Sequence, residues 1–140
     1  MSDPIRTSQA PDPVGAYPHA RKHGDLLFLS GVGPRQAGSN EIPGGPICDA
    51  AGKPRNYDIR AQTEAVIANV KAVLAACGAS LEDVLDVTVF LIDMERDFEG
   101  YNEIYAKHFS VIQAARTTIA IRALPTPIAV EFKVVARAAP

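Results

Sequence analysis

Hydrophobic and polar positions recur along the chain with two distinct periods, and each period predicts a type of element. From Asp58 to Cys77 apolar or small side chains return every three or four residues, which places them on one face of a helix. Asp58 suits the N-cap, and Gly78 suits the position just past the helix end. A second helix is predicted over residues 97–109, where an aromatic stripe has helical spacing. The stripe consists of Phe98, Tyr101, Tyr105 and Phe109. Such stripes are usually core, so both helices are expected to pack on a sheet.

Runs rich in β-branched and apolar side chains predict the strands of that sheet. They are residues 17–23 and 25–31, expected to form a hairpin, residues 84–92, and a closing hairpin over residues 116–137. The proline-punctuated residues 1–16 predict an extended arm. Residues 34–57, rich in Gly, Pro, Asn and Asp, predict a long surface loop, either a cover for a site or interface or a mobile insertion. The predicted order is β-β-α-β-α-β-β.

Two amphipathic helices and five or six strands predict an α/β (α+β) fold, a single sheet with both helices on one face. A chain of 140 residues fits one domain, residues 1–140. The opposite sheet face is left without a cover, although its expected outward positions are apolar or small. Examples are Thr88, Phe90, Ala120 and Ala129. An uncovered face of this kind predicts a homo-oligomer, with any site near the sheet rim built from two chains.

Arg116 and Glu131 are the charged residues that stand out on the two closing strands. If these strands pair as a hairpin centred between Ala123 and Leu124, the two side chains are opposite or nearly opposite each other. Burying either charge without a partner is costly. One interpretation is a structural ion pair. The other is a carboxylate-binding arginine beside a glutamate that handles water, and the pattern alone leaves both open.

The amino-acid composition argues against several classes of function. The hydrophobic fraction is 47%, the charged fraction 21% and the formal net charge −2, without a block of Lys or Arg. These values are ordinary for a globular protein and do not suggest nucleic acid as a partner. No apolar run approaches the ~20 residues that span a membrane, and the N-terminus lacks the apolar core of a secretory signal. Cys48 and Cys77 are too few for a disulfide framework, so a cytoplasmic setting is expected.

Motifs for cofactor chemistry are missing as well. The His-x-Glu and Pro-Cys-x-x-Cys pair of zinc deaminases is absent, and the three histidines (His19, His23 and His108) lack a metal-ligand spacing. Gly31-Val32-Gly33 follows a strand, but no helix begins there, so dinucleotide binding is not indicated. There is no P-loop and no Gly-x-Ser-x-Gly elbow. We therefore expect chemistry by ordinary side chains, without a cofactor or metal.

Several segments in order along the chain carry a resemblance to a known family. They are Gly15-Ala16-Tyr17, Leu29-Ser30-Gly31, residues 87–91, residues 101–105, Ala115-Arg116-Thr117-Thr118, Leu124-Pro125 and residues 130–136. Together they resemble the reactive intermediate deaminase (Rid/YjgF) family. The resemblance implies a chorismate-mutase-like fold and a homotrimer with a site in each cleft between subunits, and it leaves open whether trimers pair into a hexamer. It also implies hydrolysis of enamines or imines to a keto acid and ammonia.

The same resemblance implies roles for individual residues. Arg116 would clamp the substrate carboxylate, Glu131 would position and activate water, and Tyr17 would donate a hydrogen bond near the reacting group. Bidentate arginine–carboxylate pairing and a carboxylate general base suit that chemistry.

Other positions complete the implied site. Gly31 would leave room along its strand, and Phe90 is a further substrate-binding candidate. Many members have cysteine where this chain has Thr118. The thiol is therefore not essential to the implied reaction, and Thr118 is expected to contribute its backbone amide or hydroxyl. Asn102 matches a helix position of the family, with a structural role expected.

Within the family, the chain resembles 2-aminomuconate deaminases of aromatic-compound degradation in three stretches: residues 17–21, 52–58 and 121–127. That substrate, converted to 4-oxalocrotonate, carries a carboxylate at each end, so a second cation is expected. Arg35 is the first candidate, followed by His19 and Arg21. The alternatives are a broad deaminase of 2-imino and 2-enamino acids, and a non-catalytic module that binds ligands or proteins in the same clefts.

Overall fold

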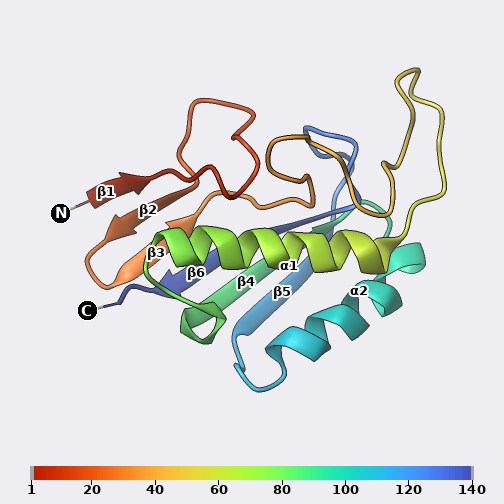
Figure 1. Ribbon diagram of the computed structural model, residues 1–140. Helices are drawn as coiled ribbons and strands as arrows, with labels where there is room; N and C mark the ends of the chain where they lie inside the picture. Colours follow the sequence, from red (N-terminus) through yellow and green to blue (C-terminus); the bar gives the residue numbers. More distant parts are fainter. Residues whose placement is uncertain (1, 140) are drawn as a thin grey trace.

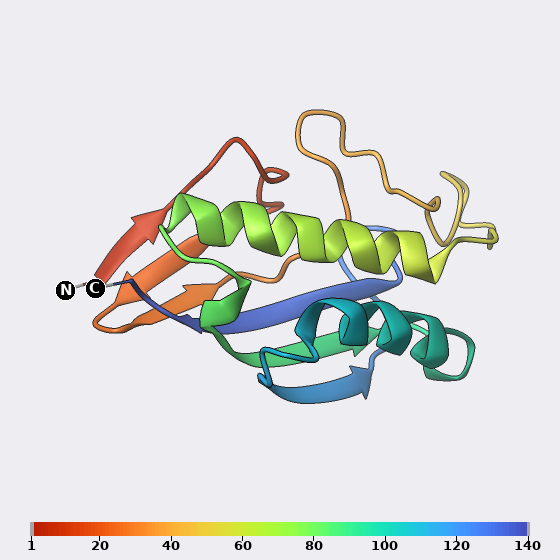
Figure 2. The same cartoon turned by 60° about the horizontal axis from the view of Figure 1, so that its bottom comes forward.

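Six strands form one sheet, and two helices cover one of its faces (Figures 1 and 2). The structure is a computed structural model and describes residues 2–139. Its elements are β1 (Ser2–Ile5), β2 (Ala20–His23), β3 (Leu26–Leu29), α1 (Ile59–Ala76), a short 3-10 turn (Leu81–Asp83), β4 (Val84–Leu91), α2 (Met94–Phe109), β5 (Ala115–Ala120) and β6 (Val130–Arg137). The predicted single sheet with both helices on one face is confirmed.

The order of strands across the sheet is β1-β2-β3-β6-β4-β5. All neighbours run antiparallel except β4 and β5, which are parallel. Parallel neighbours need a crossover, and α2 supplies it between β4 and β5. As a result β5 is an edge strand beside α2 (Figure 2).

The predicted closing hairpin is wrong, because β4 lies between β5 and β6. On β4, Arg116 pairs with Val87 and Glu131 pairs with Phe90, three residues further on. That offset, with two strand spacings, separates the Cα atoms of Arg116 and Glu131 by roughly 14 Å. The cause is the connection over residues 121–129, which is too long for a tight turn. Its first amide continues the parallel pairing, since the Ile121 N–H donates to the Leu91 carbonyl at 2.9 Å.

Two other boundaries differ from the prediction. The beginning of the expected arm forms β1, which pairs with β2 at the edge of the sheet. The second helix starts earlier, at Met94, because the Asp93 side chain accepts the Arg96 N–H and caps it. The first helix is as predicted: the Asp58 side chain accepts the Ala61 N–H, and Gly78 follows with a φ of 75°.

The core lies between the helices and the inward side chains of β3, β4 and β6. On β6 buried and half-buried positions alternate, so Phe132 faces the helices while Glu131 faces the other side. That other face has no cover among residues 2–139, as predicted, and Leu26, Phe28 and Ile119 remain 37–40% exposed. Ala129, expected to point outward, is instead fully buried. Within residues 2–139 we find no helix with the length and apolar character to span a membrane.

Candidate functional site

Glu131 lies in a small pocket on the uncovered side of the sheet. The pocket has a volume of about 120 Å³ and is lined by Val14, Tyr17, Gly31, Gly33, Arg35, Pro125, Thr126, Ile128 and Glu131. We call it the open-face pocket. Four residues proposed from the sequence therefore meet in it: Tyr17, Gly31, Arg35 and Glu131. Phe90, a fifth, is the cross-strand partner of Glu131 on β4.

Gly31 is where the Glu131 carboxylate comes closest to the backbone. A Cβ atom added at Gly31 would stand 2.6 Å from Oε2 of Glu131 and 2.9 Å from its Cδ atom. Any side chain at this position would therefore displace the carboxylate. Gly31 thus leaves room for the Glu131 carboxylate, and its substrate-binding role stays a prediction.

Burial sets the protonation behaviour of Glu131. Desolvation raises the pKa of this carboxyl above its ordinary value, and the positive charge of Arg35 acts in the opposite direction. Arg35 is held by two contacts, to Oδ1 of Asn40 at 2.7 Å and to the carbonyl of Asp12 at 2.9 Å. A carboxyl with a raised pKa beside an open pocket can exchange protons with a bound molecule.

Tyr17 stands at the mouth of the open-face pocket. Its side chain is 36% exposed, and its hydroxyl accepts the Val14 N–H at 3.3 Å. The hydroxyl hydrogen is thus free to be donated to a ligand.

Arg116 belongs to a second group of side chains, on the helix side of the sheet. Its guanidinium lies over the rings of Tyr101 and Tyr105 and donates to Oδ1 of Asn102 at 2.8 Å. The Thr118 hydroxyl, two residues along β5, bonds the Tyr101 hydroxyl at 2.7 Å. We call these five residues the Arg116 cluster. Arg116 forms no ion pair with any residue from 2 to 139, so its charge remains available for an anion.

The open-face pocket and the Arg116 cluster do not meet within one chain. They occupy opposite faces of the sheet, and β4 lies between the strands that carry Arg116 and Glu131. The ion-pair interpretation of Arg116 and Glu131 is therefore wrong. One half has a partly buried carboxyl with a raised pKa, and the other has a guanidinium that forms no ion pair within residues 2–139.

His19 does not line the open-face pocket, but it lines a smaller hollow of about 40 Å³ together with Tyr17, Gly31 and Arg35, and its substrate-binding role stays a prediction. It is buried, with Nδ1 accepting the Thr7 N–H at 3.3 Å and Nε2 donating to the Pro11 carbonyl at 2.9 Å. Both ring nitrogens are thus used to hold residues 7–11 against the sheet. In the described part of the chain, no group of three or more His, Cys, Asp or Glu side chains could hold a metal ion.

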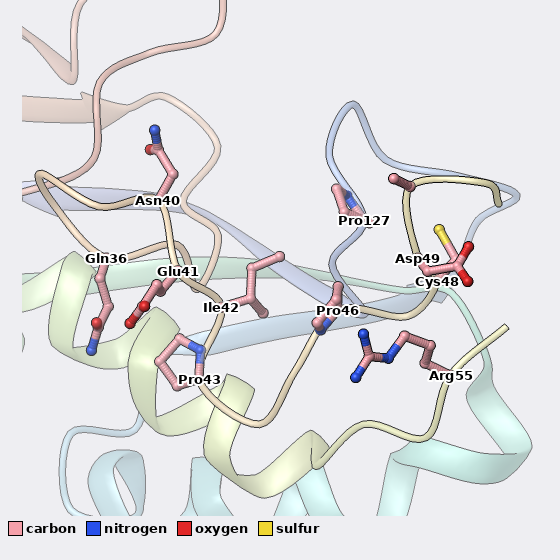
Figure 3. A pocket seen from close by; sticks show the side chains of 11 residues that line it. Gln36, Asn40, Glu41, Ile42, Pro43, Pro46, Cys48, Asp49, Arg55 and Pro127 are labelled. Atoms are coloured by element: carbon pink, nitrogen blue, oxygen red, sulfur yellow. The ribbon is translucent and has the colours of Figure 1, made fainter. Parts of the chain in front are cut away.

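A larger hollow, of about 690 Å³, lies along the loop of residues 34–57 (Figure 3). Gln36, Asn40 and Glu41 gather at one end, and Cys48, Asp49 and Arg55 at the other. It is wide and shallow, and neither the open-face pocket nor the Arg116 cluster contributes its acid–base or cationic groups to it. We therefore take the open-face pocket as the candidate site.

Tyr101 and Tyr105 contact Arg116, but they were not among the site residues predicted from the sequence. Their helical spacing with Phe98 and Phe109 indicated a core stripe, and Tyr101, Tyr105 and Phe109 are indeed buried. The additional signal was the adjacent Asn102, which helical geometry turns toward the same strand as the two rings.

Comparisons with known proteins agree with this fold. The family model described as Endoribonuclease L-PSP matches residues 7–138. A RutC family protein of Pyrococcus horikoshii is 38% identical over 136 residues, which cover 97% of this chain and 98% of that protein. The chloroplastic Reactive Intermediate Deaminase A of Arabidopsis thaliana is 36% identical, over 94% of this chain and 64% of the relative.

A solved structure is similar over nearly the same length. The Escherichia coli protein TdcF with bound serine superposes with a TM-score of 0.81 at 29% identity, and the match covers 98% of this chain and 99% of that one. A family match over 132 residues, together with relatives above 30% identity along almost the full chain, decides the assignment: the chain belongs to the Rid/YjgF (RutC) family, which includes reactive intermediate deaminases.

Proposed function

We propose that the protein hydrolyses 2-imino and 2-enamino acids to 2-oxo acids and ammonia, with broad specificity. The observation that carries the proposal is the pair of complementary half-sites. One presents a guanidinium that has no anionic partner in the described part of the chain, and the other a partly buried carboxyl with a raised pKa beside a pocket. The presence of a reactive intermediate deaminase among the relatives supports the same activity.

The proposed reaction needs only binding, orientation and proton transfer. Arg116 binds the substrate carboxylate through two parallel hydrogen bonds, which fixes the adjacent C=N bond. Ionised Glu131 takes a proton from a water molecule as its oxygen attacks the iminium carbon. Glu131 then returns that proton to the nitrogen. As ammonia leaves and the C=O bond forms, the hydroxyl proton passes to Glu131, which then releases it to the departing ammonia. An enamine first gains a proton at its β-carbon, and Tyr17 donates a hydrogen bond near the reacting atoms.

A complete site requires a second chain in this proposal. We infer a homotrimer in which the Arg116 cluster of one chain faces the open-face pocket of its neighbour. The uncovered sheet face, on which Leu26, Phe28 and Ile119 are exposed, and the free edge of β5 support this arrangement, since both are surfaces that a neighbouring chain would bury. The serine bound by TdcF is a small amino acid, the size of ligand that such a site would hold.

A narrower substrate, 2-aminomuconate, is favoured by one observation. Arg35 lines the pocket that contains Glu131, and it is the cation that acts on this carboxyl. A dicarboxylate could place one carboxylate on Arg116 and the other near Arg35. RNA cleavage, which the description of the family model names, gains no support from a net charge of −2 without a basic block.

The test is ammonia release above the spontaneous rate, compared for 2-aminoacrylate and 2-aminomuconate. Glu131→Gln should lower kcat by about 10²–10⁴-fold, the usual contribution of an acid–base group. Arg116→Ala should chiefly raise KM. Unchanged ammonia release in Glu131→Gln would show that Glu131 is not the base and would favour a non-catalytic binding module. Equal efficiency with both substrates would contradict the dicarboxylate preference.

A further inference from the structure

The guanidinium of Arg116 rests on two aromatic rings from one helix. Its Cζ atom lies 4.7 Å from the ring centroid of Tyr105 and 5.3 Å from that of Tyr101, both within cation–π range. The amide of Asn102, from the same helix, accepts one of its N–H groups at 2.8 Å. Positions 101, 102 and 105 thus meet a single side chain of β5, because residues one turn apart share a helix face.

The two rings form a rigid support. Tyr101 is fully buried and Tyr105 is 8% exposed. Tyr105 stacks on Phe109 with centroids 4.4 Å apart and planes 12° apart, and both tyrosines also contact Phe132 of β6. An arginine supported on such rings loses less freedom when it binds a planar carboxylate than a free arginine does.

The hydroxyl groups of the two tyrosines differ in their surroundings. The Tyr101 hydroxyl bonds the Thr118 hydroxyl and ties its ring to β5. The Tyr105 hydroxyl is buried without a hydrogen-bond partner in residues 2–139, and burial raises its pKa to about 12. An unpaired buried hydroxyl is a cost to stability. The hydroxyl group of Tyr105 therefore makes no visible contribution to stability, and the contact of this residue with Arg116 is made by its ring.

We propose that Tyr101 and Tyr105 are positioning residues, whose rings hold the Arg116 guanidinium in the orientation that binds the substrate carboxylate. This assignment rests on the carboxylate-binding role of Arg116 in the proposed function. The rings touch the arginine and not the reacting atoms, so they should act on substrate affinity and not on the chemical step.

Binding of pyruvate, the simplest 2-oxo acid, tests the assignment directly by calorimetry. Tyr105→Leu removes the ring and should weaken binding about tenfold, within the range of a partly desolvated cation–π contact. Tyr105→Phe keeps the ring and should bind pyruvate within about twofold of the unmodified protein. In turnover, Tyr105→Leu should raise KM by a similar factor with kcat little changed, because uniform binding is lost.

Phe109→Leu is the matched control. It removes an aromatic ring from the same stack and the same helix, but this ring does not contact Arg116. It should lower the melting temperature as Tyr105→Leu does, while pyruvate affinity stays near that of the unmodified protein. If Phe109→Leu weakens pyruvate binding as much as Tyr105→Leu, the effect is helix packing and the assignment is overturned.

A second variant and a comparison of binding with turnover complete the test. If Tyr105→Leu does not fold, Tyr105→Met fills more of the space without an aromatic ring and should show the same tenfold loss. Unchanged affinity in either variant overturns the assignment. If pyruvate binds in an Arg116-dependent way and follows the expected ring dependence, but no imine is hydrolysed, the deaminase proposal fails and the role of the tyrosines stands.

Discussion

Arg35 and Glu131 share the open-face pocket, and the arginine charge opposes the effect of burial on the glutamate pKa. The base form of Glu131 is the ionised one, so activity should rise with pH as this carboxyl loses its proton. Arg35→Met removes the charge that favours ionisation. The acidic limb of the kcat/KM profile should therefore move to higher pH, which a pH series from 4 to 8 would measure.

Arg35→Lys is the matched control for that profile, because it keeps the positive charge on a flexible side chain. Its acidic limb should stay nearer to that of the unmodified protein than the limb of Arg35→Met. An acidic limb that is the same in all three proteins would show that Glu131 is not the group being titrated.

Gly31 is a second position at which one substitution has a clear expected effect on activity. A methyl group there would come within 3 Å of the Glu131 carboxylate, which must then move. Gly31→Ala should reduce kcat by more than about tenfold, since misplacing a catalytic group by about 1 Å has costs of this order. Steady-state ammonia release would measure the loss.

A double-mutant cycle separates this displacement from other effects of the methyl group. If Gly31→Ala acts through the carboxylate, it should cause little further loss in a Glu131→Gln background. Equal losses in both backgrounds would mean that the methyl group disturbs something other than Glu131.

The start of α2 is fixed to the end of the long loop by a buried carboxylate. Asp97 is fully buried, accepts the Tyr57 hydroxyl at 2.5 Å and pairs with Arg96 at 2.8 Å. Tyr57→Phe leaves one buried carboxylate oxygen without its donor. The free energy of unfolding should fall by about 1–3 kcal/mol, measured by urea denaturation at a fixed protein concentration.

Asp97→Asn provides the comparison for this contact. With the charge removed, Tyr57→Phe should cost less than it does in the unmodified protein, because hydrogen bonds to charged groups are the stronger ones. Identical costs in both backgrounds would contradict a contribution from the buried charge.

Helices were the elements that the sequence predicted best, and strand pairing was the level at which the prediction failed. The Asp58 cap and the apolar period located α1 because both are local signals. The prediction of a closing hairpin failed because β-branched residues indicate where a strand lies but not which strand it pairs with. The order of strand, helix and strand from β4 to β5 indicated a parallel crossover, and the nine residues from 121 to 129 argued against a tight turn.

The same distinction applies to the candidate site as a unit. The roles of Tyr17, Gly31 and Glu131 were implied by the family resemblance, and Arg35 was chosen as a cation for a second carboxylate; these four residues do meet in one pocket. His19 was chosen on the same grounds, yet it holds the N-terminal arm, a long-range contact that no local pattern shows. The distance between Arg116 and Glu131 could not be predicted, because β5 and β6 do not pair with each other. Each pairs with β4, and these two registers set the distance.

A site shared between chains can be tested by restoring activity from two inactive variants. Arg116→Ala and Glu131→Ala each remove one half-site, so at a substrate concentration well below the raised KM of Arg116→Ala each variant alone should show little deaminase activity. When the two are unfolded together in equal amounts and refolded, random assembly into rings makes about a quarter of the interfaces intact. Ammonia release should then reach roughly a quarter of the unmodified rate, provided that each site needs one Arg116 and the Glu131 of a neighbour.

Mixing the two folded variants without denaturation is the control, because chains that do not exchange cannot form an intact interface. A site within one chain would give no recovery in either experiment, since every chain lacks one of the two groups. Such a result would contradict the proposed assembly. It would also conflict with the sheet topology, in which β4 separates Arg116 and Glu131 and their side chains face opposite sides. Recovery only after joint refolding would therefore identify the neighbouring chain as the source of the missing half.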